Sequence, residues 1–295
     1  MGQVSEGKKS ERFKFIDEHQ ARFGIRYLCK KMNVSFQGYY QWCHRKPSSR
    51  DLENAHLTEK IIRLYEKHKG NYGSPRIVAE LKAEGVHVNH KRVARLMKEA
   101  SLVGKAGRIY RRKPLPENSC IKVPNKQREK GFPKKPNQQW VGDVTYLKVK
   151  GQWRYLAVIL DLCSRKVIGW ELSNSRTSEL TLSALNKAAR FRRRTKGMIF
   201  HSDRGSEYGA HAYRDRLTEL DIEPSMNRPG YMNDNVYVES FFQSMKTECY
   251  KGVEFESDEQ LRSTLNWYLG RYYNRDRRHS ALGFISPTKY ETMSA

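Results

Sequence analysis

Residues 139–172 read QWVGDVTYLKVKGQWRYLAVILDLCSRKVIGWEL, and this stretch decides the fold. Runs rich in Val, Ile, Tyr and Trp near 140–149, 153–162 and 165–172 are separated by short turn-forming segments, which is typical of an antiparallel meander. The middle run is apolar on both faces, as expected of a strand that is covered on both sides. Asp143 therefore lies on a central strand, where a charge is costly unless a metal or a hydrogen bond compensates it.

Two further acids change the interpretation of Asp143, since a single Asp in a strand is more often a satisfied structural residue. After a predicted helix over 178–194, a short strand ends in Asp203 and a Gly turn. The carboxyl end of a strand is a common place for a site in an α/β sheet. Glu239 falls in a segment whose apolar residues follow helical spacing, and Lys246, seven residues later, projects from nearly the same face.

These acids resemble the D,D(35)E triad of transposases and retroviral integrases, because 35 residues separate Asp203 from Glu239. The motifs around these acids closely resemble those of the second-frame (OrfB) transposases of bacterial insertion-sequence family three. These motifs are QWVGDVTY, HSDRGSEY, VESFFQSMKTE and YYNRDRRHSALGFISPTKYE. The resemblance covers most of the chain, from about 48 to 290. One departure is Val236, since relatives often have Asp-Asn-Ala where this chain has Asp-Asn-Val at 234–236.

The resemblance implies an α/β fold with an RNase H-like mixed-sheet catalytic core, preceded by small helical helix-turn-helix units. It also implies a DDE transposase that cleaves insertion-sequence ends and joins the 3′-hydroxyl to DNA. Such displacements need charge stabilised on the entering and leaving oxygens, which two divalent ions provide. Carboxylates suit Mg²⁺, for which Mn²⁺ can substitute. By the resemblance Asp143 bridges two Mg²⁺ ions, and Asp203 and Glu239 each hold one.

Two alternative functions remain open at this point. The same core would serve a hydrolytic nuclease, which cuts without joining, and a strand-transfer assay on paired end sequences separates the two. A non-catalytic DNA-binding regulator of the element belongs to a different class of protein. An intact triad argues against a regulator, since a repressor does not need three metal-binding carboxylates at this spacing.

Charge and cysteine content narrow the class of partner and the compartment. The formal net charge is +24 at pH 7, which indicates a polyanionic partner, and DNA or RNA fits better than a membrane because no long apolar segment accompanies the charge. The first residues lack an apolar signal region, so we expect a cytoplasmic, nucleoid-associated protein. Five scattered cysteines favour reduced thiols over a disulfide framework. The His and Cys residues near the N-terminus lack zinc-ligand spacing.

The N-terminal half predicts two helical units, over 1–48 and 49–104. In the first, residues 1–11 are frayed, a helix spans 18–32, and Ser35 caps an aromatic-rich helix. In the second, Ser74 is the predicted N-cap and Pro75 the first residue of a helix that Gly85 ends. A further helix over 89–100 buries apolar residues, and its basic face is the candidate recognition surface, with a merely solvated face as the alternative. That face carries His90, Lys91, Arg92 and Arg95.

Residues 105–137 are basic, contain several prolines and lack apolar periodicity, which predicts a basic linker. We expect it to follow DNA phosphates through Arg111, Arg112 and Lys113. The catalytic core then spans 138–295 and ends in a helical tail, with a helix over 257–274.

Three further residues are accessory candidates. His201 shares the strand face of Asp203, although a structural role suits it better than that of a base, because metal-activated attack needs no imidazole. Asn235 and His279 lie in the two family-like words around Glu239 and the tail. The resemblance also implies the partners: terminal inverted repeats, target DNA, a homo-oligomer on DNA, and an upstream-frame (OrfA) product or fusion, since this chain has no sustained heptad repeat.

Overall fold

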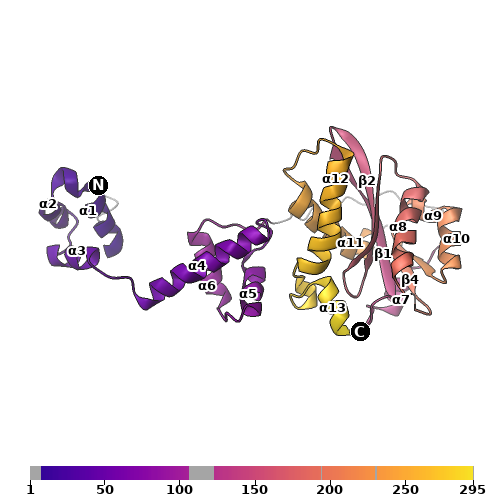
Figure 1. The fold of residues 1–295 in the computed structure, drawn as a ribbon, viewed down its shortest axis with the longest axis horizontal. Helices are drawn as coiled ribbons and strands as arrows, with labels where there is room; N and C mark the ends of the chain where they lie inside the picture. Colours follow the sequence, from indigo (N-terminus) through magenta and orange to yellow (C-terminus); the bar gives the residue numbers. More distant parts are fainter. Residues whose placement is uncertain (1–7, 106–122, 194, 230, 295) are drawn as a thin grey trace. The chain divides into compact units, whose positions relative to one another are not determined.

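The computed structural model describes residues 8–105, 123–193, 195–229 and 231–294 (Figure 1). The chain divides into two compact units, Met1–Ile61 and Ile62–Ala295, and each is described by itself. Within the described residues, no helix is both long enough and apolar enough to cross a membrane. The domain boundaries expected from the sequence stay predictions.

The first unit contains α1 (Lys9–Phe23), α2 (Ile25–Lys31) and α3 (Phe36–Cys43). The prediction of one helix over 18–32 is wrong. Helix α1 already begins at Lys9, and Gly24 separates it from α2. Gly24 has φ of 74°, a left-handed conformation that glycine adopts without a steric cost. Ser35 caps α3 as predicted, accepting a 3.0 Å hydrogen bond from the amide of Gly38. Six side chains form the buried core: Phe13, Ile16, Leu28, Cys29, Met32 and Tyr39.

The second helical segment contains α4 (Ser49–Lys67), α5 (Ser74–Ala83) and α6 (His90–Glu99). The apolar residues predicted to face inward on α6 are buried, namely Val93, Leu96 and Met97. The predicted cap of α5 is wrong: Gly73 is the N-cap, and Ser74 is the first helical residue. The Ser74 hydroxyl instead hydrogen-bonds the Nε2 atom of His90 at 2.9 Å, which links the starts of α5 and α6.

The strands form one mixed sheet with the order β3-β2-β1-β4-β5. Their bounds are β1 (Gln139–Val149), β2 (Gln152–Asp161), β3 (Val167–Ser173), β4 (Ile199–Ser202) and β5 (Glu223–Met226). The predicted meander is confirmed, since β1 to β3 pair antiparallel in sequence order. β4 pairs in parallel with both β1 and β5. β1 is therefore central, as the sequence predicts.

Helices cover both faces of this sheet (Figure 1). One face packs with α8 (Ser178–Phe191), α9 (Ser206–Gly209) and α10 (His211–Glu219), around a core that includes Trp140 and Phe200. The other packs with α11 (Val236–Met245), η2 (Lys246–Tyr250), α12 (Asp258–Leu265) and η3 (Asn266–Asp276). The helical tail is present as predicted, but from Asn266 it continues as a π-helix. A 3₁₀ turn, η1 (Met232–Asn235), precedes α11, and η4 (Ser280–Leu282) precedes the last helix.

The end of the predicted basic linker is ordered, which corrects the expectation of a flexible segment for residues 123–137. Helix α7 (Lys126–Lys130) packs against β4 and β5. Lys126 and Lys130 both contact the carboxylate of Glu223, at 2.9 and 3.4 Å. Part of the positive charge in this segment therefore pairs with the core. Arg111, Arg112 and Lys113 lie outside the described residues.

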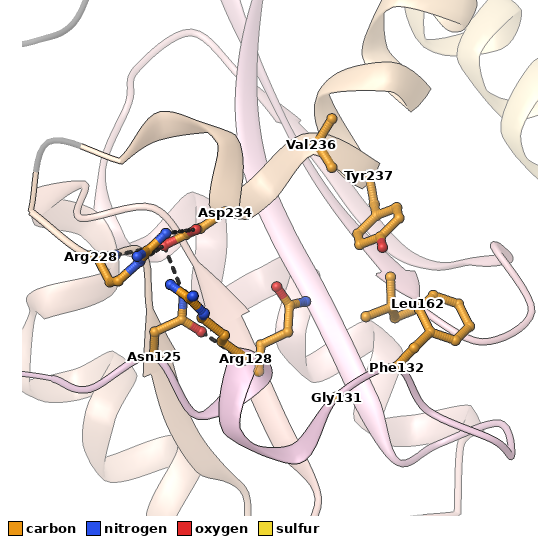
Figure 2. A pocket seen from close by; sticks show the side chains of 10 residues that line it. Asn125, Arg128, Gly131, Phe132, Leu162, Arg228, Asp234, Val236 and Tyr237 are labelled. Atoms are coloured by element: carbon orange, nitrogen blue, oxygen red, sulfur yellow. Dashed lines mark hydrogen bonds and ion pairs between the residues drawn. The ribbon is translucent and has the colours of Figure 1, made fainter.

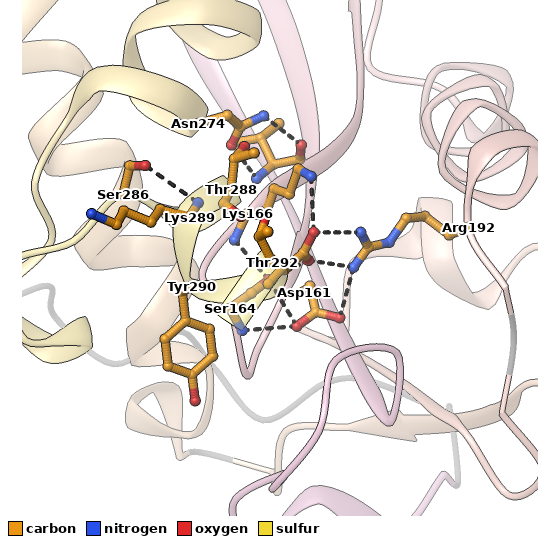
Figure 3. A network of polar contacts seen from close by, with 12 residues as sticks. Asp161, Ser164, Lys166, Arg192, Asn274, Ser286, Thr288, Lys289, Tyr290 and Thr292 are labelled. Carbon is orange, nitrogen blue, oxygen red and sulfur yellow. Dashed lines mark hydrogen bonds and ion pairs between the residues drawn. The ribbon is translucent and has the colours of Figure 1, made fainter. Parts of the chain in front are cut away.

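An ion-pair network fixes the last helix, α13 (Pro287–Ser294), to the core (Figure 3). Arg192 donates two hydrogen bonds to Glu291, at 2.6 and 2.9 Å, and lies 3.4 Å from the carboxylate of Asp161. Lys166 contacts Glu291 at 2.8 Å. Burial alone would raise the pKa of Glu291, but the hydrogen bonds from Arg192 and Lys166 lower it to about 2.

Glu291 is therefore expected to make the free energy of unfolding depend on pH. Its pKa is lower in the folded protein than in the unfolded chain, so its contribution is complete above about pH 4.5 and is lost as the pH falls towards 2. The full contribution is up to about 3 kcal/mol. Urea unfolding of the wild type and Glu291→Gln between pH 6 and pH 2.5 measures it. The difference between the two proteins should shrink on acidification, and a constant difference would contradict the assignment.

A second buried network joins the segment around α5 to the tail, within the unit Ile62–Ala295. The carboxylate of Glu248 accepts three hydrogen bonds of 2.6 to 3.0 Å from Arg277 and one of 2.8 Å from the hydroxyl of Tyr268. Arg76 lies 3.5 Å from the same carboxylate. The hydroxyl of the fully buried Tyr72 accepts a 2.7 Å hydrogen bond from the amide of residue 278. The YGSPR stretch at 72–76 thus contacts the tail.

Candidate active site

Asp143 lies on the central strand with only 6% of its surface exposed. One carboxylate oxygen accepts a 2.7 Å hydrogen bond from the amide of Val144. β1 and β4 pair in parallel with Val141 opposite His201. Extending this register by two residues brings Asp143 level with Asp203, and side chains at the same level of adjacent strands point to the same face of the sheet.

Asp203 directly follows β4, at the carboxyl end of the strand, where the sequence predicts it. Its carboxylate accepts a 3.0 Å hydrogen bond from the amide of Gly205, which holds the turn after the strand. A Cβ atom at Gly205 would lie 2.7 Å from the carboxylate of Glu207. A larger residue at position 205 would therefore force the Glu207 carboxylate to move.

Glu239 is half-buried on α11, which packs against β1. One helical turn earlier, the buried Asn235 donates a 3.1 Å hydrogen bond to the carbonyl of Gly142, the residue before Asp143. This contact connects the start of α11 to the strand beside Asp143. Asp143 thus lies within β1, Asp203 follows the end of the neighbouring strand β4, and Glu239 lies on the helix that packs on β1.

The donor set of the predicted triad fits a hard divalent cation, because all three side chains offer carboxylate oxygens. In the part of the chain that the structure describes, no three His, Cys, Asp or Glu side chains are grouped closely enough to hold an ion. Backbone placement, rather than a preassembled ligand cluster, therefore underlies the assignment of the triad.

An ion pair beside the two aspartates was not predicted from the sequence. The carboxylate of Glu207 is buried and accepts hydrogen bonds from Nε and an Nη atom of Arg176, at 2.9 and 2.7 Å. Burial lowers the pKa of Arg176, but the hydrogen bond and charge of Glu207, followed by the charges of Asp203 and Asp143, raise it further. The guanidinium is therefore a local counter-charge for both aspartates, and about half of the Arg176 side chain (46%) stays exposed.

Removing the charge of Glu207 is expected to lower catalytic activity without unfolding the protein. Glu207→Gln keeps the shape of the side chain but loses the charge that orients Arg176. Mutating a residue that orients a metal ligand or its neighbours typically lowers activity 10- to 100-fold, so we expect the rate of joining to fall by about that factor. Joining assays at several Mg²⁺ concentrations measure it, with the exposed Glu219→Gln as the control. Equal activity of the two variants would leave Glu207 a purely structural residue.

A cavity of about 290 Å³ opens beside the start of α11 (Figure 2). On one side the guanidinium of Arg228 contacts Asp234 at 3.1 Å, and the amide of Asn125 donates to the same carboxylate at 2.8 Å. On the other side lie Val236 and Tyr237. The pair of Arg228 and Asp234 holds the turn that leads into the helix of Glu239. Val236, where the sequence departs from its relatives, lines this cavity and adds no bulk against the triad.

The two histidines predicted as accessory residues, His201 and His279, are in buried environments. His201 is fully buried, and its ring nitrogens lie 2.8 Å from the Ser225 hydroxyl and 2.8 Å from the Asn227 side-chain oxygen. Burial lowers the pKa of His201 to about 4, more than the hydrogen bond to Asn227 raises it. Burial and nearby arginines lower the pKa of His279 to about 3. Both rings are therefore neutral at pH 7.

Among the described residues, those predicted to bind DNA lie on the outer face of α6 and at Lys246, beyond Glu239. On α6, His90, Lys91 and Arg95 are exposed and Arg92 is half-buried. Lys246 follows α11, and its ammonium lies 4.6 Å from the centre of the Tyr146 ring. Glu248, two residues after Lys246, is buried against Arg277 and Tyr268.

Family comparisons match this architecture. Residues 133–232 match the Integrase core domain family, residues 220–287 match a second Integrase core domain family, and residues 51–113 match the HTH-like domain family. Among solved structures, the simian T-cell lymphotropic virus intasome in complex with PP2A regulatory subunit B56 gamma has a TM-score of 0.46 at 19% identity, covering 78% of this chain and 74% of that one. That TM-score is too low to add to the assignment.

Curated relatives extend the match over nearly the whole chain. Transposase InsF for insertion sequence IS3A of Escherichia coli (strain K12) is 38% identical over 95% of this chain and 98% of its own length. Transposase InsF for insertion sequence IS3fB of the same strain is 37% identical over 96% of this chain and 99% of its own. The insertion element IS600 31 kDa protein of Shigella sonnei is 36% identical over 91% and 100%. With its integrase-type core and helix-turn-helix-like segment, the chain belongs to the IS3 family of transposases.

Proposed function

We propose that this DDE transposase performs its chemistry with Asp143, Asp203 and Glu239. The observation that supports this most is that β1 and β4 pair in parallel up to Val141 and His201, two residues before Asp143 and Asp203, while α11, which carries Glu239, packs against β1. The proposed reaction cleaves DNA at the insertion-sequence ends and joins the freed 3′-hydroxyl to target DNA.

The three carboxylates would hold two Mg²⁺ ions, with Mn²⁺ as a substitute. When bound, these ions stabilise the negative charge that develops on the entering and leaving oxygens of the phosphodiester. The contribution of the chain is to fix the ligands: the amide of Val144 orients Asp143, the amide of Gly205 orients Asp203, and Asn235 fixes the start of the helix of Glu239.

DNA contacts extend beyond the triad in this proposal. The exposed basic face of α6 binds the terminal inverted repeats. Arg111, Arg112 and Lys113, in the linker sequence between α6 and the catalytic core, contact DNA phosphates. A net charge of +24 supports a path with many phosphate contacts. We further propose that the protein acts at the nucleoid as a homo-oligomer on paired ends, with the upstream-frame product as partner or fusion.

Incubating the purified protein with DNA carrying its element's ends and Mg²⁺, with and without the upstream-frame product, tests this function. Cleaved ends covalently joined to a target strand are the expected products. The competing function is a hydrolytic nuclease, which would release cut ends that are never joined. Cleavage without joining under every condition would favour the nuclease, and binding without cleavage would favour a regulator.

Lys246 is expected to position the DNA at this site. It lies seven residues beyond Glu239, at the end of the same helix, and a cation there suits the phosphate next to the one that is cleaved. Lys246→Ala should therefore reduce joining at limiting DNA, and Lys246→Arg should recover part of the loss, because charge matters more here than the shape of the ammonium. Lys246 is half-buried, so the substitution should cost about 1 kcal/mol of stability, which thermal unfolding measures separately from joining. Full joining by Lys246→Ala at limiting DNA would remove this residue from the site.

A further inference from the structure

At its tip, the hairpin of β1 and β2 has one face that is buried in the core and one face that is exposed to solvent. Leu147 and Val149 point into the core under the tail helices. The opposite face carries Tyr146, Lys148 and Trp153, which together are termed the hairpin patch. Lys148 pairs directly with Trp153 across the two strands, so their side chains share a face. Tyr146 and Trp153 are 56% and 46% exposed, whereas Trp140 and Phe200 in the same sheet are buried.

The two rings contact one another, and each has an ammonium group over it. Their centroids are 5.1 Å apart with planes at 89°, an edge-to-face arrangement. The Nζ atom of Lys148 lies 4.6 Å from the centre of Trp153, and that of Lys246 lies 4.6 Å from the centre of Tyr146. Scattered exposed aromatics are ordinary on protein surfaces, but a contacting pair between two cations combines the two features that bind unpaired nucleotides.

The hairpin patch lies next to the candidate active site. Tyr146 follows Asp143 by three residues on the same strand, about 10 Å along an extended chain, and its side chain leaves the opposite face of β1. β4 pairs with β1 only as far as Val141, so it does not cover the edge beside Tyr146. Lys246, which reaches the ring of Tyr146, belongs to the helical run that begins with the helix of Glu239. A DNA strand held at the triad would therefore reach the patch by passing around this uncovered edge of β1, where Lys246 contacts Tyr146.

We propose that the hairpin patch stacks an unpaired base of the DNA end beside the cleaved phosphate. The inference rests on the proposed function, because it takes the triad as the point where the DNA strand is held. In a duplex the faces of the bases are occupied by their neighbours, so an aromatic ring can stack only on a base that has left the helix. The lysines then contact the adjoining phosphates. Such binding tolerates any base, because every base has a π-face.

Binding of DNA to the full-length protein without divalent metal tests the proposal. Fluorescence anisotropy compares single-stranded and duplex oligonucleotides of one sequence with the wild type, Tyr146→Ala, Trp153→Ala and Trp153→Phe. The two alanine variants should lose about tenfold in affinity for the single strand and little for the duplex, and Trp153→Phe should retain most of it. Phe191→Ala is the matched control, since Phe191 is 77% exposed and lies 5.4 Å from the guanidinium of Arg190.

The alternative outcomes are distinguishable. An equal loss on both DNAs would show that the patch contributes only charge or structure, and no loss on either would show that it does not bind DNA. A change in oligomeric state by sedimentation would identify the patch as an interface between copies of the chain. Each of these results overturns the proposal. Because binding is measured without metal and without reaction, an inactive triad would leave this result readable, and normal joining by the alanine variants would not alter the proposed function of the triad.

Discussion

Asp143→Asn, Asp203→Asn and Glu239→Gln are each expected to abolish cleavage and joining while DNA binding stays nearly unchanged. Each substitution preserves the shape of the side chain and removes the charge that binds a divalent cation. Because the ions would stabilise both the entering and the leaving oxygen, losing one ligand should cost several kcal/mol of transition-state stabilisation, about 10³-fold or more in rate. Gel assays of cleavage and strand transfer on labelled ends measure the loss.

Matched controls separate this effect from a general loss of negative charge. Asp215→Asn on α10 and Glu259→Gln on α12 change exposed carboxylates on other parts of the same unit, and both should join normally. Isothermal titration of Mg²⁺ gives a second readout, since each triad variant should bind the metal more weakly. Near-normal joining by one triad variant in Mg²⁺ would remove that residue from the catalytic set.

Glu248→Ala is expected to give the largest loss of stability of any single change proposed. The carboxylate of Glu248 is 4% exposed, and Arg277, its bidentate partner, is 3% exposed. Removing the acid leaves a buried guanidinium without its partner. Breaking a buried ion pair in this way costs about 3–5 kcal/mol, which corresponds to about 10 °C in Tm for a unit of this size. Calorimetry and urea unfolding measure both quantities.

An exposed ion pair gives the comparison for this effect. Arg216 and Glu219 approach to 2.6 Å, but the glutamate side chain is 62% exposed, so Glu219→Ala should cost less than about 1 kcal/mol. Glu248→Gln should fall between the two, because the amide can still accept from Tyr268 but carries no charge. Equal stability of Glu248→Ala and Glu219→Ala would show that water or rearrangement compensates Arg277.

Features with a local pattern were predictable from the sequence. The period-two runs and turn residues of 139–172 give the meander, and the apolar spacing gives α6 and α11. Asp203 was assigned to a strand end from the Gly turn that follows it. The break at Gly24 also had a signal, a glycine inside a helical pattern, and it was outweighed by the apolar residues on either side.

Features that depend on distant partners had no local signal. Arg176 and Glu207 are separated by 31 positions, and nothing in the local pattern around Glu207 indicates that its carboxylate is buried. Helix α7 has no apolar periodicity that would predict it. Ion pairs from Lys126 and Lys130 to Glu223 attach it to the core instead. The π-helical register after Asn266 likewise has no local signal, since its apolar residues also satisfy the spacing of an ordinary α-helix.

The contacts of the YGSPR stretch also constrain the order in which the chain can fold. Tyr72 and its partner at residue 278 are 206 positions apart, and Arg76 meets Glu248 only when the second half of the chain exists. Contacts of such high sequence separation form late, because a long loop must close first. A nascent chain released just after Glu239 would contain the triad and the basic α6 helix but lack the tail that engages Tyr72. Premature termination late in translation would therefore yield a chain in which Tyr72 and Arg76 lack their partners in the tail.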